Sequence, residues 1–316
     1  MRVAVIDLGT NTCNLLIAEL NSLGYKILHQ SKQLVKLGDD KIRENEISEA
    51  ATARVLQSFQ IHKKLISDFK AEKVRVVATS AVRTAENKIH FLEQISENSG
   101  WIVKLISGEK EAEMIFEGVM LAFNEFKKPA LILDIGGGSN ELIVAHHKQM
   151  LWKESQPTGM ARIINKFHLS DPIHPVEINS LKNYFTEAHK NAFEKCKTEN
   201  IKTLVGCSGA FDTIADIIDS VNPGVKLRTT QEILISEFYS VYQTLLKSTR
   251  EQRLLMKGMD MVRVDLIVPA VIFIEQFISG IGIIQIIQTD FALREGVLFE
   301  MMNRGHGPDS PYVCIA

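Results

Sequence analysis

The chain has 316 residues, of which 45% are hydrophobic and 23% are charged. This composition is ordinary for a globular protein and excludes disordered, collagen-like and low-complexity architectures. Lysine and arginine total 36 against 38 for aspartate and glutamate, so the formal net charge of -2 gives no field that would attract nucleic acid or another polyanion. Any anion site must therefore be local. At roughly 150 residues per domain, the length predicts two domains.

The cysteines and the N-terminus predict the compartment. The four cysteines lack the paired spacing of a zinc site or a disulfide scaffold; they are Cys13, Cys196, Cys207 and Cys314. Met1 leads directly into a short apolar run ending at Asp7, which does not resemble a signal peptide. The apolar segment 264–288 is interrupted by Asp265 and Pro269 before it reaches membrane-spanning length. We therefore expect a cytoplasmic protein that does not associate with membranes.

The first part of the chain alternates between strand and helix patterns. The patterns predict strands at residues 2–6, 14–20, 25–33, 74–78 and 102–106, and helices from Ser48 to about residue 69, at 85–100 and at 109–126. Residues 127–129 are basic and end in proline, so they are the expected interdomain linker.

The second part begins with the same pattern as the first, because predicted strands at 130–135 and 141–145 flank another glycine-containing turn. The remainder predicts helices at 161–167, 176–198, 211–220, 231–246, 264–278 and 293–303, with strands at 203–207 and 283–288. The fold class is α/β, with a first domain at 1–126 and a second at 127–292. The last helix, within 293–316, is long enough to cross back to the first domain, and the sequence leaves this undecided.

Two turns carry the clearest chemistry, since each follows an aspartate at a strand end, Asp7 or Asp134. Small and hydroxyl residues make up these turns: Gly9, Thr10 and Asn11 in one, and Gly136, Gly137, Gly138 and Ser139 in the other. Their N–H groups can point at phosphate oxygens while the aspartate holds a divalent cation. Either turn alone is equally typical of a hairpin with a solvated aspartate. Their duplication, together with a third turn at Ser208 and Gly209, favours phosphate binding.

Neither a Walker A sequence nor a GxGxxG fingerprint occurs, which disfavours P-loop and Rossmann folds. Seven other strings stand in a recognisable order: DLGTNTCNLL from Asp7, ATSAVRTAEN from Ala78, SGEKEAEMIFEGV from Ser107, DIGGGSNELIV from Asp134, VGCSGAF from Val205, RVDLIVPAV from Arg263 and ALREGVL from Ala292. The paired turns resemble the actin, Hsp70 and sugar-kinase superfamily. The strings resemble, over nearly the whole chain, the exopolyphosphatase and guanosine pentaphosphate phosphohydrolase family, called Ppx/GppA.

This resemblance implies two ribonuclease-H-like, actin-like ATPase domains with an interdomain cleft, and Mg2+-dependent hydrolysis of a terminal phosphoanhydride. By motif position, Glu111 matches the proposed general base and Arg83 the phosphate-binding arginine. Asp134 and Glu141 match an acidic metal-binding pair, to which we add Asp7. From composition alone, the same acids could be solvated surface groups, and Thr10 and Ser139 could simply cap their own turns.

The expected substrate is inorganic polyphosphate, with pppGpp as the alternative. An ATP-dependent phosphotransferase and a non-catalytic phosphate or nucleotide sensor are the rival functions, and a homodimer is left open. Lys110 departs from the family pattern, because many members carry an acid there. We expect the pairs Arg263 with Asp265 and Arg294 with Glu295 to be ion pairs inside the second domain.

Overall fold

The computed structural model describes residues 1–22, 24–38, 45–303 and 313–314. This part of the chain contains two six-stranded sheets. It divides into unit 1, made of Met1–Leu121 with Leu293–Ala316, and unit 2, made of Ala122–Ala292. The last helix, whose place the sequence left undecided, thus belongs to unit 1. Residues 304–312 and 315–316 of the predicted C-terminal segment lie outside the described residues.

Unit 1 is built on the sheet with strand order β12-β3-β2-β1-β4-β5. Its strands are β1 (Arg2–Leu8), β2 (Thr12–Asn21), β3 (Gly24–Leu34), β4 (Lys73–Ala78), β5 (Val103–Leu105) and β12 (Val313–Cys314). The first three form an antiparallel meander, and β4 and β5 then add parallel to β1. Its helices are α1 (Glu49–Asp68), α2 (Ser80–Thr84), α3 (Lys88–Ser99), α4 (Gly108–Ala122) and α12 (Leu293–Asn303).

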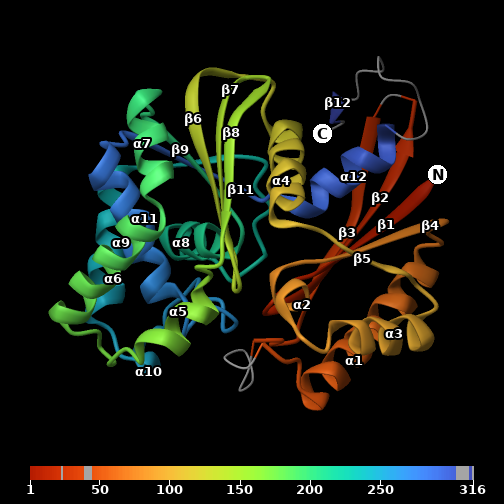
Figure 1. Ribbon diagram of the computed structural model, residues 1–316. Helices are drawn as coiled ribbons and strands as arrows, with labels where there is room; N and C mark the ends of the chain where they lie inside the picture. The colour runs from red at the N-terminus through yellow and green to blue at the C-terminus, as the bar shows by residue number, and fades with distance from the viewer. Residues whose placement is uncertain (23, 39–44, 304–312, 315–316) are drawn as a thin grey trace. The chain divides into compact units, whose positions relative to one another are not determined.

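Both faces of β1 are buried, which explains its continuous apolar run. Ala4, Ile6 and Leu8 join the hydrophobic core formed with α1 and α3, and Figure 1 shows these two helices lying together. Successive strand residues point to opposite faces, so Val3 and Val5, which are also fully buried, point away from that core. Helix α12 contacts both β1 and β2. The N-terminal strand is therefore the centre of unit 1.

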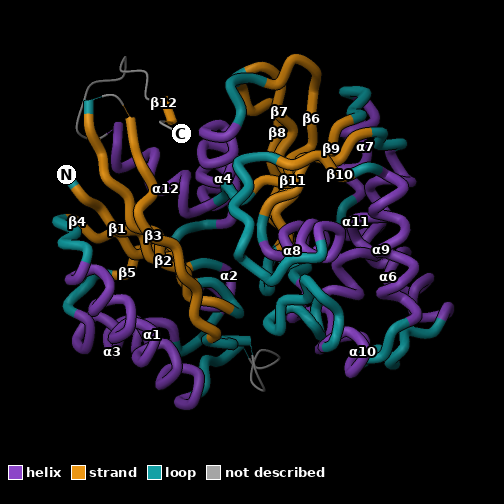
Figure 2. Tube along the Cα trace, turned by 180° about the vertical axis from the view of Figure 1, so that it is seen from behind, coloured by secondary structure: helices purple, strands orange, loops and turns teal. Residues whose placement is uncertain are grey.

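Unit 2 repeats this plan in a sheet of order β10-β11-β9-β6-β7-β8 (Figure 2). Its strands are β6 (Phe126–Ile135), β7 (Asn140–His147), β8 (Gln149–Gln156), β9 (Thr203–Cys207), β10 (Gln231–Ile233) and β11 (Gln285–Thr289). Strands β6 to β8 form the meander, and β9 and β11 add parallel to β6. The order 3-2-1-4-5 thus occurs twice, which confirms the predicted α/β class and its pair of ribonuclease-H-like folds.

The helices of unit 2 are α5 (Met160–Phe167), α6 (Pro175–Ala188), α7 (Lys190–Thr198), α8 (Gly209–Asp219), α9 (Ile235–Lys247), α10 (Arg250–Leu254) and α11 (Ile267–Ile281). Helix α11 lies within the apolar segment 264–288, and it packs against α5, α6, α7, α8 and α9. None of the helices in the described ranges is both long and apolar enough to cross a bilayer.

Several sequence-based expectations were wrong. The expected linker at 127–129 lies inside β6, and the helix before it ends at Ala122. Strand β8 was not predicted, and the helix expected at 176–198 is two helices that break at His189. The helix expected at 231–246 begins only at Ile235, after the short strand β10.

Candidate functional site

In unit 1, the predicted site residues gather at one edge of the sheet. Strands β1, β4 and β5 are parallel neighbours, with Leu8 opposite Ala78 and Ala78 opposite Leu105. The segments that leave the carboxyl ends of parallel strands meet at the same edge. These segments are the N-terminal turn (residues 9–12), helix α2 with Arg83, and helix α4 with Glu111.

Arg83 and Glu111 are in direct contact. The Arg83 Nη1 atom donates a hydrogen bond to Glu111 Oε2 at 2.9 Å and another to the carbonyl oxygen of Ile106 at 3.0 Å. Glu111 is only 7% exposed. It lies in the first turn of α4, where the hydroxyl of Ser107 accepts the N–H of Lys110 and caps the helix. Residues 28 positions apart thus form a partly buried pair of a carboxylate and a guanidinium.

The N-terminal turn presents backbone N–H groups on one side. It is closed by the N–H of Gly9, which donates to the carbonyl of Thr12 at 2.9 Å. The carbonyl of Thr10 accepts from Leu37, and that of Asn11 accepts from Val35. In a trans peptide the carbonyl and the following N–H point in opposite directions. The N–H groups of Asn11 and Thr12 therefore point away from this neighbouring segment.

Asp7 precedes that turn and is opposite Asn14 across β1 and β2. The Asn14 amide donates to Asp7 Oδ2 at 3.0 Å. The other oxygen, Oδ1, is buried and makes no hydrogen bond to the residues the structure describes. Burial raises the pKa of Asp7 to about 6, against the opposing effect of the Asn14 hydrogen bond and the Arg294 charge. The side chain thus has one oxygen left for a proton or a cation.

In unit 2, the equivalent turn is the glycine loop (residues 136–139). It is closed by the N–H of Gly136, which donates to the carbonyl of Ser139 at 3.0 Å. Its next carbonyls are all held by α5: Gly136 accepts from Met160 N–H at 3.0 Å, Gly137 from Ala161 N–H at 2.9 Å, and Gly138 from Arg162 Nε at 3.0 Å.

By the same peptide geometry, the N–H groups of Gly137, Gly138 and Ser139 all point away from α5. No hydrogen bond from these three groups is seen within the described ranges. Consecutive N–H groups on one side form a concave anion site, which suits phosphate oxygens. The loop can be this close to α5 because Gly159 has no side chain: a Cβ there would lie 2.4 Å from the Gly138 nitrogen.

Next to this loop, Asp134 and Glu141 form the carboxylate pair. They are directly opposite each other on β6 and β7, so both side chains point to the same face. They are 7% and 2% exposed, and Ser155 donates a hydrogen bond to Glu141 Oε1 at 2.7 Å. Mg2+ is commonly held by one or two carboxylates together with substrate phosphates. No cluster of three or more metal-ligating side chains forms among the described residues, but the carboxylate pair fits this smaller ligand set.

The third predicted turn lies at the same edge of the second sheet, because Asp134 is opposite Cys207 on the parallel strand β9. Ser208 has φ +72° and ψ 170°, a conformation that only glycine adopts readily and that is often found at functional sites. The guanidinium of Arg263 lies against Gly209, where a Cβ would be 2.4 Å from its Nη2 atom. A cation is therefore placed at the start of α8.

Two arginines at this edge were not predicted as site residues. Arg263 was expected to pair with Asp265, but Asp265 pairs with Arg250 at 2.6 Å. Arg162 holds the glycine loop, which no sequence signal indicated. Arg294 and Glu295 do approach each other, at 3.6 Å, although in unit 1 and not in the second domain as expected.

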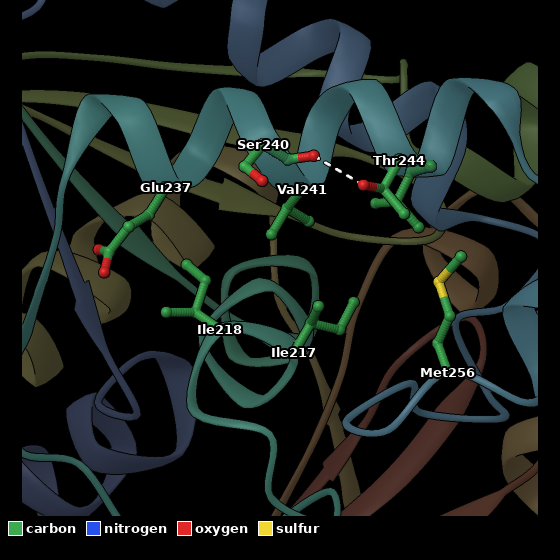
Figure 3. A pocket seen from close by; sticks show the side chains of 8 residues that line it. Ile217, Ile218, Glu237, Ser240, Val241, Thr244 and Met256 are labelled. Atoms are coloured by element: carbon green, nitrogen blue, oxygen red, sulfur yellow. Dashed lines mark hydrogen bonds between the residues drawn. The ribbon is translucent and has the colours of Figure 1, made fainter.

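A separate pocket of about 340 Å³ lies between α8 and α9 in unit 2 (Figure 3). Its lining is largely aliphatic, with Ile217, Val241 and Met256 among its side chains, and it contains no predicted site residue. Glu237 is its acidic residue, and this carboxylate accepts the N–H of Leu234 at the start of α9. None of the residues that line this pocket is basic, so it offers no cationic side chain to a phosphate.

Comparisons with known proteins point to one family. The Ppx/GppA phosphatase family matches residues 16–305. A bifunctional 3-dehydroquinate synthase/phosphatase from Fusobacterium nucleatum is 30% identical over 296 residues, which cover 88% of this chain but only 43% of that protein. Exopolyphosphatase 2 from Mycobacterium tuberculosis is 26% identical, covering 95% of this chain and 98% of that one.

Among solved structures, an exopolyphosphatase from Cytophaga hutchinsonii superposes with a TM-score of 0.91 at 32% identity, covering 96% of this chain and 98% of that one. The match in fold agrees with the match in sequence over nearly the full chain, and it confirms the resemblance carried by the seven motifs. The chain therefore belongs to the Ppx/GppA phosphatase family and is a phosphatase of the hydrolase class.

Proposed function

We propose that this protein is an exopolyphosphatase that releases terminal orthophosphate from inorganic polyphosphate by metal-assisted attack of water. The observation that carries the proposal is the glycine loop, whose three aligned N–H groups lie beside the carboxylate pair. This arrangement can bind phosphate oxygens through the loop and a divalent cation through the carboxylates. Relatives named as exopolyphosphatases support polyphosphate as the substrate.

In the proposed mechanism each residue has a defined part. Asp134 and Glu141 would hold Mg2+, which supplies neutralising charge to the phosphate oxygens. The loop N–H groups bind equatorial oxygens, and the fixed Arg83 guanidinium adds positive charge. Glu111 orients the attacking water and accepts its proton. Because Arg83 already contacts Glu111, the two side chains are held together before substrate arrives.

The alternative substrate is pppGpp, since the glycine loop and the carboxylate pair recognise only phosphate and would accept a 5' triphosphate equally. Incubation of the purified protein with polyphosphate, pppGpp and ATP in separate reactions distinguishes the candidates by the phosphate released. We expect release from polyphosphate to be fastest. ADP formed only with an added acceptor would instead indicate a phosphotransferase, and tight binding without release would indicate a sensor.

Removal of the metal tests the same mechanism. We expect EDTA to abolish phosphate release and Asp134→Asn to do the same without unfolding, because the change removes a ligand charge and no core volume. Glu154→Gln is the matched control. Glu154 lies on β8 next to Ser155, so its side chain points to the opposite face from the carboxylate pair. Undiminished turnover in metal-free buffer would contradict the metal assignment.

A further inference from the structure

A chain of three buried polar side chains lies beside the glycine loop. Asn140, the residue after the loop, donates through Nδ2 to the Thr158 carbonyl at 2.8 Å and to Thr158 Oγ1 at 3.0 Å. Thr158 Oγ1 is 2.8 Å from His189 Nε2. Asn140 and His189 are 0% exposed and Thr158 is 3% exposed. Each link therefore forms away from water, where loss of a partner is costly.

The Asn140 amide donates to Thr158, and the direction of the hydrogen bond between Thr158 and His189 depends on the tautomer of the imidazole. Thr158 Oγ1 accepts from Asn140, so its own hydrogen is available to His189. Burial lowers the pKa of His189 to about 3, which keeps the imidazole neutral, so that Nε2 accepts from Thr158 in one tautomer and donates to it in the other. The imidazole itself is fixed where α6 ends and α7 begins, with its ring 4.8 Å from that of Phe273 on α11. The chain thus runs from Asn140 through Thr158 to a fixed imidazole.

The position of Thr158 determines the position of the glycine loop. The next residue, Gly159, has its backbone against Gly137 and Gly138, and the N–H groups that hold the loop carbonyls follow at Met160 and Ala161. A shift of Thr158 would therefore move Gly159 and the start of α5. The carbonyls of the glycine loop would move with them, and so would the N–H groups on its other side.

We propose that Asn140, Thr158 and His189 are positioning residues for phosphate binding: through Gly159 and α5, they fix the direction of the N–H groups of the glycine loop. This rests on the proposed function, because it takes the glycine loop as a phosphate site. The three side chains themselves do not contact substrate. A merely structural role would lower the stability of unit 2 and leave phosphate affinity intact.

The test compares Thr158→Val, which keeps the shape but loses the hydroxyl, with Thr158→Ser, which keeps the hydroxyl. Binding of magnesium pyrophosphate is measured by calorimetry, well below each unfolding midpoint, alongside kcat and KM for polyphosphate. We expect Thr158→Val to weaken binding and kcat/KM roughly ten- to hundredfold, as small misplacements of donors do, and Thr158→Ser to restore both. Ser248→Ala, which also removes a buried hydroxyl in unit 2, is the control that should leave binding unchanged.

A second pair tests the end of the chain. His189→Gln can place either a donor or an acceptor near the Nε2 position and should retain pyrophosphate binding. His189→Leu removes the hydrogen bond to Thr158 and should weaken pyrophosphate binding, as Thr158→Val does. If Thr158→Val bound pyrophosphate as tightly as the parental protein and only its unfolding midpoint were lower, the proposal would be overturned. If the parental protein binds pyrophosphate but does not hydrolyse polyphosphate, the proposed function fails while the affinity comparison still decides the role of these residues.

Discussion

Glu111 differs from its neighbouring acids in burial and in partner. It is 7% exposed and accepts a hydrogen bond from Arg83, whereas Glu109 is exposed and Glu113 is 3.5 Å from Lys110. All three lie in the first two turns of α4. Its burial and its contact with Arg83 thus distinguish Glu111, the proposed general base, from the two neighbouring acids.

Glu111→Gln should therefore lose most of the activity. The amide keeps the size of the side chain and can still accept from Arg83, but it cannot take a proton from water. Loss of a general base typically costs about 10² to 10⁴ in rate. Single-turnover phosphate release measures the effect, and pyrophosphate binding should be nearly unchanged.

Glu109→Gln and Glu113→Gln serve as controls and should hydrolyse substrate at close to the parental rate. Glu109 is exposed and Glu113 is partly buried beside Lys110, and substitutions of such surface groups usually change stability little. If Glu111→Gln matched these two variants, Glu111 would have no part in proton transfer.

At the scale of the elements, the position of α4 depends on α12. A Cβ on Gly296 would lie 1.7 Å from the carbonyl oxygen of Met114, so the two helices approach with their backbones in contact. Lys110 adds an ion pair with Glu300 at 2.7 Å. The lysine that departs from the family pattern thus joins α4, the helix that carries Glu111, to the C-terminal helix α12.

Gly296→Ala should force α12 away from α4 and destabilise unit 1. Overpacking of this kind costs about 1 to 3 kcal/mol, and here the obstacle is backbone that cannot rotate aside. A lowered thermal unfolding midpoint checks this. Asn303→Ala, at the exposed end of the same helix, should leave the midpoint unchanged, and equal midpoints for both variants would disprove the close approach.

The sequence predicted those helices, strands and turns whose signal, a hydrophobic periodicity or a capping residue, lies within the element itself. Helix α12 was predicted with its observed bounds, and the glycine-containing turns were found because glycine and aspartate mark them. The prediction of a linker at 127–129 is wrong. It depends on proline ending the preceding helix, but that helix already ends at Ala122. Pro129 is instead tolerated where the pairing of β6 with β7 is irregular, between Phe126 and Ala130.

Other features had no local signal. Strand β8 is only half-buried and lacks clear alternation, and the break at His189 has neither glycine nor proline. The contact between Arg83 and Glu111 follows from the order of β4 and β5 in the sheet, which periodicity cannot give. The motifs named both residues but could not show that they touch.

At the scale of the whole molecule, the two units share a plan but not their chemistry. Asp7 is opposite Asn14, and Asp134 is opposite Glu141 at the same spacing. The second acid of unit 2 is thus an amide in unit 1, and that amide occupies one oxygen of Asp7. The proposed cation site therefore belongs to unit 2, and the proposed general base, Glu111, belongs to unit 1 with Arg83.

Unit 2 is continuous from Ala122 to Ala292, whereas unit 1 needs the segment that begins at Leu293. Leu293, Val297 and Leu298 are buried, so a fragment of residues 1–121 would expose the surface that α12 covers. We expect the fragment 122–292 to unfold cooperatively in urea and the fragment 1–121 to do so only when a peptide of residues 293–303 is added. Circular dichroism measures both transitions.

The same fragments separate binding from catalysis. The fragment 122–292 retains the glycine loop and the carboxylate pair but lacks Glu111 and Arg83, so it should bind magnesium pyrophosphate and release no phosphate from polyphosphate. Asp134→Asn in this fragment should weaken the binding, because one of the two carboxylates for the cation is lost. Phosphate release by the fragment alone would show that the attacking water is activated within unit 2, and would remove the general base from unit 1.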